Sequence, residues 1–151
     1  MWREKRMLAR AIMFAAIYHC DEDERGRPFI LHAIDVMNNL AIKNNERLST
    51  IAVLHGILER TDITEERLRK EFPDDVVDAV VALTRKPNQS YFEYIEQVSK
   101  NPHAVVVKIS DLDFSVDRSS AETKEIEQYT DARDTLLQKV LGGSLGKVLG
   151  I

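Results

Sequence analysis

The residues of this chain with the clearest capacity for chemistry are a histidine and a glutamate in the segment Ile51-Ala-Val-Leu-His-Gly-Ile-Leu-Glu-Arg-Thr61. On an α-helix, residues four positions apart project from one face, so His55 and Glu59 would lie together. Gly56 stands inside the expected helix, where glycine costs about 1 kcal/mol relative to alanine. Such a residue indicates close backbone contact with a ligand or the loss of a former functional side chain. The spacing alone favours a core histidine over a ligand.

Five segments occur in the order found in small hydrolases of the HD superfamily. They are Arg25-Gly-Arg-Pro-Phe-Ile-Leu-His32, Leu54-His-Gly-Ile-Leu-Glu-Arg-Thr-Asp-Ile-Thr64, Ala82-Leu-Thr-Arg85, Tyr91-Phe-Glu-Tyr-Ile95 and Val107-Lys-Ile-Ser-Asp-Leu112. From about residue 8 to 140 the chain resembles the alarmone pyrophosphohydrolases, the hydrolase half of the RelA/SpoT family and its single-domain forms. The resemblance implies an all-helical fold and removal of the 3′-pyrophosphate from guanosine tetra- or pentaphosphate. Some single-domain relatives act on other phosphorylated nucleotides.

The resemblance also implies a metal site. In the family a divalent ion, usually manganese, is bound by a histidine, a His-Asp pair and a later aspartate, and a Glu-Asp pair one turn further on positions water and substrate. The matching positions are His32, His55 with Gly56, and Asp111 for the metal, and Glu59 with Arg60 for the catalytic pair. The ion acts as a Lewis acid and lowers the pKa of its bound water, which supplies hydroxide near neutral pH.

The chain departs from the family pattern at four places in this site. The aspartate of the His-Asp pair is Gly56, that of the Glu-Asp pair is Arg60, and an asparagine usual after the last ligand is Ser115. The basic segment that grips phosphate is replaced by an Asp-Glu-Asp-Glu run at 21–24. A charge run by itself indicates a solvated loop, but beside a phosphate pocket this one would repel the substrate.

These departures weaken the expected metal site without removing it. His32, His55 and Asp111 remain, and two imidazoles with a carboxylate can hold a divalent ion. A positive charge at position 60, about 7 Å from the ion, would cost roughly 5 kcal/mol at an effective dielectric of ~20. Since residues 56 and 60 would be stacked on one helix, we expect the guanidinium to lean towards the metal position, held by Asp111 or Glu59. There it could bind an anion bidentately.

Further candidates for substrate binding come from the same segments. Arg25 and Arg27 precede the second expected helix and are the expected phosphate contacts. Lys108 lies one turn before Asp111 and could face the cleft, although a surface lysine is the more common case. Tyr91 matches an aromatic position of the family, and core packing explains it nearly as well.

The elements that must position these residues are helices. Apolar residues recur at helical spacing, as at Ile30, Ala33, Ile34 and Met37, and no stretch alternates with period two. We expect helices near 3–19, 29–43, 47–60, 64–72, 74–84, 90–99, 103–116 and 120–141. The predicted fold is an all-α, single compact HD-domain bundle of about eight helices over 1–141, followed by a flexible, glycine-rich tail at 142–151.

The composition is that of one globular domain, with 151 residues, 44% of them hydrophobic and 30% charged. The net charge of −4 argues against a nucleic-acid partner. No apolar run approaches the roughly 20 residues of a membrane span. The single cysteine, Cys20, cannot form an internal disulfide, so we expect a cytoplasmic protein. Homo-oligomer formation is left open.

These observations favour a degenerate HD domain that has lost alarmone hydrolysis and binds a phosphorylated nucleotide or another protein. Two alternatives stay open. One is a working phosphohydrolase that uses manganese at His32, His55 and Asp111 together with Glu59. The other is a scaffold protein without a small-molecule site. The sequence leaves open whether the chain is an enzyme.

Overall fold

The chain folds into helices. In the computed structural model, residues 6–23, 25–118 and 123–142 are described. They contain nine helices: α1 (Met7–Tyr18), α2 (Phe29–Asn38), α3 (Glu46–Leu54), α4 (Ile57–Arg60), α5 (Glu65–Glu71), α6 (Asp74–Ala82), α7 (Tyr91–Ser99), α8 (Pro102–Arg118) and α9 (Thr123–Leu141). Within these residues the β pairing is limited to an isolated bridge between Glu22 and Pro28. The all-α prediction is confirmed; the predicted tail, apart from Gly142, lies outside the described residues.

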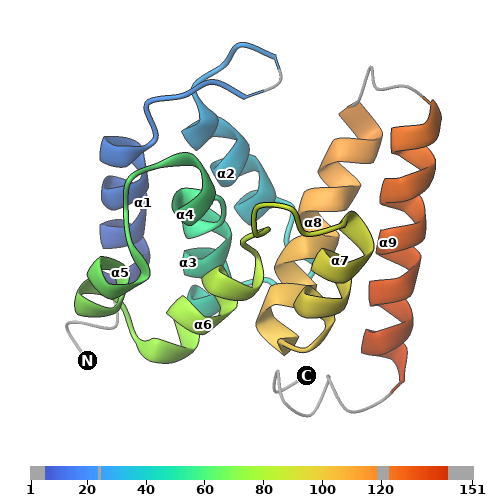
Figure 1. Cartoon of the computed structure of the whole chain (residues 1–151). Helices are drawn as coiled ribbons and strands as arrows, with labels where there is room; N and C mark the ends of the chain where they lie inside the picture. The colour runs from blue at the N-terminus through green and yellow to red at the C-terminus, as the bar shows by residue number, and fades with distance from the viewer. Residues whose placement is uncertain (1–5, 24, 119–122, 143–151) are drawn as a thin grey trace.

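The central helix is α3, and it explains why the bundle has one core. Residues 50–57, which run from α3 into α4, are all buried. A helix buried on every side must be surrounded by other helices, and α3 packs against α1, α2, α6 and α8. Figure 1 shows α3 between α1 on one side and α8 on the other. Position 55, at the end of this helix, is therefore held by the centre of the core.

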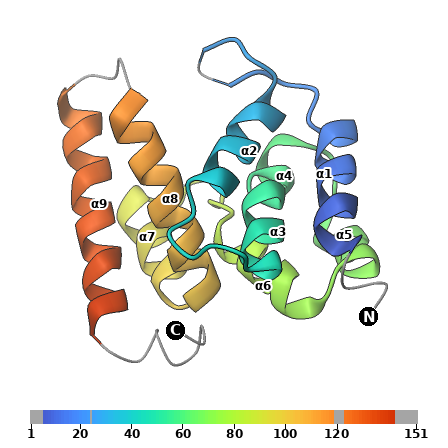
Figure 2. The same ribbon diagram turned by 180° about the vertical axis from the view of Figure 1, so that it is seen from behind.

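The second half of the bundle is formed by α7, α8 and α9, which lie side by side in Figures 1 and 2. Helix α8 contacts α2, α3, α6, α7 and α9, so it joins the two halves. Its buried residues include Val105, Val107 and Leu112. Among the described helices, none combines the length and apolarity that crossing a bilayer requires.

The predicted helix at 47–60 is wrong in one respect, because the structure breaks it in two. Helix α3 ends at Leu54, His55 is extended with φ −61° and ψ 141°, and Gly56 is left-handed with φ 82°. A left-handed residue cannot continue a right-handed helix, and glycine adopts that conformation at the least cost. Gly56 is thus the break between α3 and α4, and His55 and Glu59 do not share one helical face.

Candidate functional site

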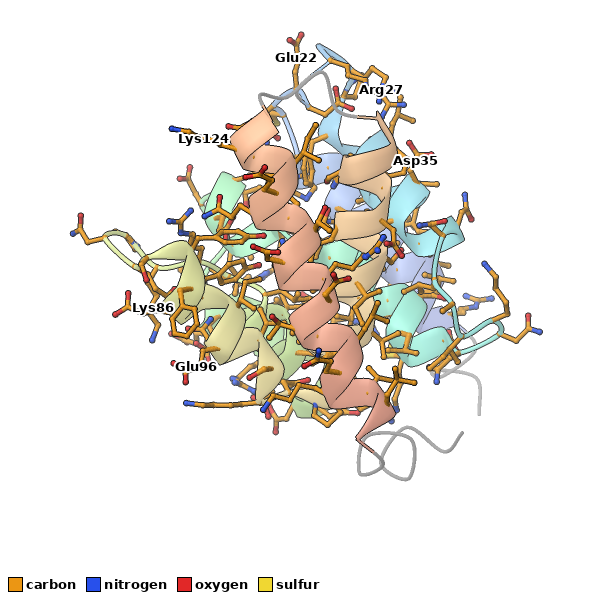
Figure 3. All side chains as sticks on the ribbon, turned by 90° about the vertical axis from the view of Figure 1, so that its right-hand side faces the viewer. Glu22, Arg27, Asp35, Lys86, Glu96 and Lys124 are labelled. Carbon is orange, nitrogen blue, oxygen red and sulfur yellow. The ribbon has the colours of Figure 1, made fainter. Side chains whose placement is uncertain are left out.

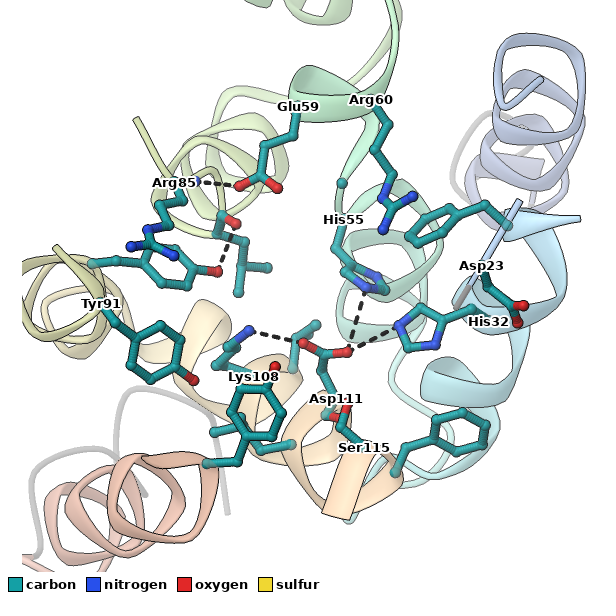
Figure 4. Close-up of a pocket in the computed structure, with 18 of the residues that line it drawn as sticks. Asp23, His32, His55, Glu59, Arg60, Arg85, Tyr91, Lys108, Asp111 and Ser115 are labelled. Atoms are coloured by element: carbon teal, nitrogen blue, oxygen red, sulfur yellow. Dashed lines mark hydrogen bonds and ion pairs between the residues drawn. The ribbon is translucent and has the colours of Figure 1, made fainter. Parts of the chain in front are cut away.

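Three residues from distant parts of the chain meet in a pocket at the junction of the two halves. His32 comes from α2, His55 follows α3, and Asp111 comes from α8. The Oδ1 atom of Asp111 lies 3.0 Å from Nε2 of His32 and 3.8 Å from Nε2 of His55. One ligand atom from each residue lies within 4.8 Å of the others. Figure 4 shows both imidazoles turned towards the Asp111 carboxylate. The fold therefore brings together the three predicted metal ligands.

The orientation of His55 suits metal binding. Its Nδ1 donates a hydrogen bond to the carbonyl oxygen of Ala52 at 2.5 Å, so the lone pair of a neutral ring is on Nε2, which faces Asp111. Burial lowers the pKa of His55 to about 4, which keeps the imidazole neutral at pH 7. A backbone carbonyl that fixes the tautomer in this way is the usual support of a ligating histidine.

Lys108 belongs to the centre of the pocket, so the more common reading of it as a surface residue is wrong. Its side chain is only 12% exposed, and its Nζ lies 2.9 Å from Oδ2 of Asp111. Burial acts to raise the pKa of Asp111, but the charge of Lys108 and the hydrogen bond from His32 outweigh burial and hold that pKa well below its ordinary value. Asp111 is therefore an ionised carboxylate. Its Oδ2 atom contacts Lys108, and its Oδ1 atom faces the two imidazoles.

This donor set fits a divalent ion, with two nitrogen ligands and one oxygen ligand. The fit is incomplete at position 56, where the family has a carboxylate. A Cβ on Gly56 would lie 3.2 Å from Cζ and 3.3 Å from Cε1 of Phe29. The Phe29 ring also contacts the rings of His32 and His55, with centroids 5.2 and 5.9 Å apart. An aromatic ring thus fills the space beside Gly56.

Arg60 does not reach the metal position, and the expectation that Asp111 or Glu59 would hold it is wrong. Its Nη1 lies 2.5 Å from Oδ2 of Asp21, and its guanidinium carbon lies 4.0 Å from the centroid of the Phe29 ring. Arg60 does lie one turn after Gly56, and its backbone N–H donates to the Gly56 carbonyl oxygen at 2.9 Å, but its guanidinium extends over the Phe29 ring to Asp21. Because Asp21 neutralises the guanidinium, the electrostatic cost to a bound cation is much smaller than a lone charge would impose.

The acidic run is not the solvated loop that its composition indicates. The Asp23 side chain is only 8% exposed. Its Oδ1 accepts the backbone N–H groups of Arg25 and Arg27 at 2.9 Å, and its Oδ2 accepts Nε of Arg27 at 2.8 Å. Arg27 also contacts Asp35 at 3.3 Å, and Figure 3 shows these two side chains on the same edge of the molecule. Asp21 and Asp23 are thus paired with Arg60 and Arg27, whereas Glu22 between them is exposed.

The pocket includes every predicted site residue and several that the sequence did not single out. The predicted residues that line it are Arg25, Arg27, His32, His55, Gly56, Glu59, Arg60, Tyr91, Lys108, Asp111 and Ser115. The additional lining residues include Phe29, Arg85 and Tyr129; Tyr94, which like Tyr91 matches an aromatic position of the family, also lines the pocket. Arg85 and Tyr94 lie in segments that carry the family resemblance, which was a usable signal, whereas Tyr129 on α9 has no such signal. The carboxylate of Glu59 accepts the backbone N–H of Arg85.

Of three curated relatives, two are named as pyrophosphohydrolases of guanosine-3′,5′-bis(diphosphate) and one as a probable GTP pyrophosphokinase. The chain is 28% identical over 114 residues to the guanosine-3′,5′-bis(diphosphate) 3′-pyrophosphohydrolase of Aquifex aeolicus (strain VF5), covering 69% of the chain and 16% of that protein. It is 31% identical over 84 residues to the enzyme of the same name from Borreliella burgdorferi, covering 54% and 13%. A probable GTP pyrophosphokinase of Mycobacterium leprae is 30% identical over 116 residues, covering 70% and 15%. No protein-family model matches the chain.

A solved structure has a fold similar to that of this chain. It is described as a metazoan ortholog of SpoT that hydrolyzes ppGpp and plays a role in starvation responses, and it superposes with a TM-score of 0.71 over 92% of this chain and 89% of its own, at 23% identity. The chain has the HD-domain fold, and it is similar in sequence to two guanosine-3′,5′-bis(diphosphate) 3′-pyrophosphohydrolases. It spans only 13 to 16% of the length of the three curated relatives.

In this HD domain, the residues that match the family pattern and two that differ from it lie in neighbouring but distinct groups. The residues that match the family's histidines and later aspartate are clustered around one point. The two positions that differ by charge or size, Gly56 and Arg60, are packed against the same ring, Phe29. These two departures therefore form one connected structural unit beside the cluster.

Proposed function

We propose that this HD domain binds a phosphorylated nucleotide of the (p)ppGpp class and that its metal-dependent hydrolysis is impaired. The observation that carries the proposal is the exchange at position 56, where a backbone without a side chain faces the Phe29 ring. A carboxylate ligand has gone and its space is occupied. The pocket keeps the means to bind an anion, because it is lined by Arg25 and Arg85 in addition to the cluster.

The retained residues define what the site can still do. A divalent ion, with manganese the one to test, would be held by His32, His55 and Asp111, and it would polarise a phosphoryl oxygen and acidify water. Glu59 is the remaining carboxylate of the catalytic pair, and it lines the pocket. Arg60 cannot take a proton at neutral pH, because a guanidinium stays charged. The chain thus keeps ligand-binding groups but only half of the pair that positions water.

A second candidate function is hydrolysis with the three-ligand site. Two observations favour it. The Nε2 lone pair of His55 already faces Asp111, and the charge of Arg60 is neutralised by Asp21. Under this proposal the metal would bind without displacing a proton from His55. The substrate would be a phosphorylated nucleotide in both cases, so the two functions differ in turnover and not in ligand class.

The deciding experiment compares the parent chain with a repaired variant. The repair is Gly56→Asp with Arg60→Asp and Phe29→Leu, since a smaller side chain at position 29 makes room beside position 56. Binding of ppGpp is followed by isothermal titration calorimetry, and pyrophosphate release is followed with and without Mn²⁺. We expect the parent to bind ppGpp with little release and the repaired variant to gain turnover. A parent that hydrolyses ppGpp as fast as the repaired variant would refute the impairment and support the second function.

A further inference from the structure

The cations that line the pocket differ in how they are paired. On the side of the connection between α1 and α2, Arg60 is paired with Asp21, and Arg27 with Asp23 and Asp35. In the centre, Lys108 is paired with Asp111. A phosphate that bound to one of these groups would have to replace a carboxylate already in contact with it. Such an exchange adds little net attraction, because one anion replaces another.

Arg85, in the connection between α6 and α7, is not paired with an acid in this way. Its backbone N–H donates to Glu59, and its Nε donates to the carbonyl oxygen of Gln89 at 3.0 Å. The two Nη atoms have no partner among the described residues, and no described carboxylate lies within ion-pair distance of them. The guanidinium carbon lies 5.7 Å from the centroid of the Tyr91 ring. Arg85 therefore offers the pocket a charged donor fork that no acid has occupied.

Tyr91 supplies a second unused donor on the same side. Its hydroxyl is buried and has no hydrogen-bond partner among the described residues. A buried hydroxyl without a partner is unfavourable, and a ligand oxygen or a bridging water would satisfy it. Burial raises the pKa of Tyr91 to about 12, so the hydroxyl keeps its proton near neutral pH. Figure 4 shows Arg85 and Tyr91 on the opposite side of the pocket from His32 and Asp23.

We propose that Arg85 and Tyr91 form an anion subsite that binds a phosphate or pyrophosphate group of the ligand remote from the His32–His55–Asp111 cluster. The planar fork of Arg85 can hold two phosphate oxygens at once, and Tyr91 can donate to a third. This subsite deepens the proposed function, since it fixes how the ligand lies. One anionic group is directed to the α6–α7 side, and the acid-paired side formed by Arg27 and Arg60 contributes little to phosphate affinity.

The test uses calorimetric titration of the full chain with ppGpp and, separately, with inorganic pyrophosphate. Arg85→Gln is expected to raise the Kd for both probes at least about tenfold, which corresponds to about 1.4 kcal/mol. Arg85→Lys keeps the charge but loses the fork, and should fall between the parent and Arg85→Gln. Tyr91→Phe is expected to raise the Kd about threefold to tenfold, because one hydrogen bond to a charged group is lost.

Two other variants serve as comparisons. Lys86 is the next residue, is exposed, and points away from the helices in Figure 3. Lys86→Gln removes the same charge and should change the Kd less than about twofold. Arg27→Gln should weaken binding less than Arg85→Gln does. Circular dichroism and the unfolding midpoint show whether each variant is folded.

The outcomes separate the subsite from the proposed function. If Arg85→Gln binds both probes like the parent, or Arg27→Gln loses as much affinity as Arg85→Gln, the subsite is wrong even though ppGpp binds. If pyrophosphate binds in an Arg85-dependent way and ppGpp does not bind, the subsite stands and the proposed function fails. If neither probe binds the parent chain, both are refuted.

Discussion

The edge of the Phe29 ring lies 3.2 Å from the point where a Cβ atom on Gly56 would stand. Real Cβ atoms seldom approach another atom so closely, so the glycine and the ring are fitted to each other. Gly56 is also left-handed, with φ 82°, a conformation that disfavours side chains independently of the ring. The packing of the pocket wall therefore disfavours the carboxylate that the family resemblance implies at this position.

The first prediction separates these two effects with alanine. Gly56→Ala is expected to lower the free energy of unfolding by about 2–4 kcal/mol, from about 1–2 for the left-handed backbone and a further 1–2 for displacing the ring. Gly26→Ala is the matched control, because Gly26 has φ 73° but its nearest heavy atom would be 3.8 Å away. It should lose only the backbone contribution. Urea denaturation measures both, and equal losses would contradict the role of Phe29.

The second prediction concerns the ion pair between Arg60 and Asp21. The two side chains are 36% and 34% exposed, so solvent screens their attraction. A double-mutant cycle with Arg60→Gln and Asp21→Asn should give a coupling of about 0.5–1 kcal/mol at low salt, and less at high salt. The pair Arg47–Asp75, at 44% and 48% exposure, is the comparison and should give a smaller value. A coupling near zero for Arg60 and Asp21 would mean that the guanidinium is held by Phe29 alone.

Helical periodicity predicted most of the fold because it is a local property of the sequence. The stripe around Ile30, Ala33 and Met37 marks α2 without reference to any partner. The break at Gly56 was not predicted, since glycine can adopt either the helical or the left-handed conformation and the sequence does not show which one it takes here. The same glycine inside a regular helix would look identical in the sequence. Local pattern thus located the elements but could not show where packing interrupts one.

The site residues could be predicted where the family resemblance supplied them. The ion-pair partners of those residues could not be predicted. His32, His55 and Asp111 come together as the resemblance implied. Arg60 was assigned a carboxylate nearby on its own expected helix or in the metal cluster, whereas its partner Asp21 is 39 positions earlier. Several acids were within plausible reach of a long side chain. Only the positions of the helices in space decide between them.

The third prediction is a pH dependence caused by His55. Burial lowers its pKa to about 4 in the folded chain, against about 6.5 in the unfolded chain. Between these values the unfolded chain binds a proton that the folded chain does not. Stability is therefore fully present above pH 6.5 and is lost as the pH falls towards 4, by about 3 kcal/mol in total.

The variant His55→Gln should flatten this dependence by up to about 1.4 kcal/mol per pH unit between pH 6 and pH 4.5. Burial also lowers the pKa of His19, which adds a loss of the same sign that remains in the variant. His103→Gln, which removes a histidine outside the pocket lining, is the control for the loss of a histidine at another position. The slope of the unfolding free energy with pH is measured from denaturation curves collected in the presence of a chelator at several pH values. An unchanged slope in His55→Gln would show that this histidine is not the cause.

The last prediction follows from the contact between Lys108 and Asp111. Lys108→Met keeps much of the side-chain volume but leaves a largely buried carboxylate without its ammonium partner, so the metal-free variant should lose about 3 kcal/mol of stability. The same change removes a positive charge that competes with a metal ion for Asp111. Mn²⁺ should therefore raise the unfolding midpoint of Lys108→Met more than that of the parent. Adding His32→Ala to this variant should abolish the effect of Mn²⁺ if the ion binds at the cluster. A variant as stable as the parent in chelator would show that Lys108 contributes nothing to holding Asp111, and a Mn²⁺ effect that survives His32→Ala would place the ion elsewhere.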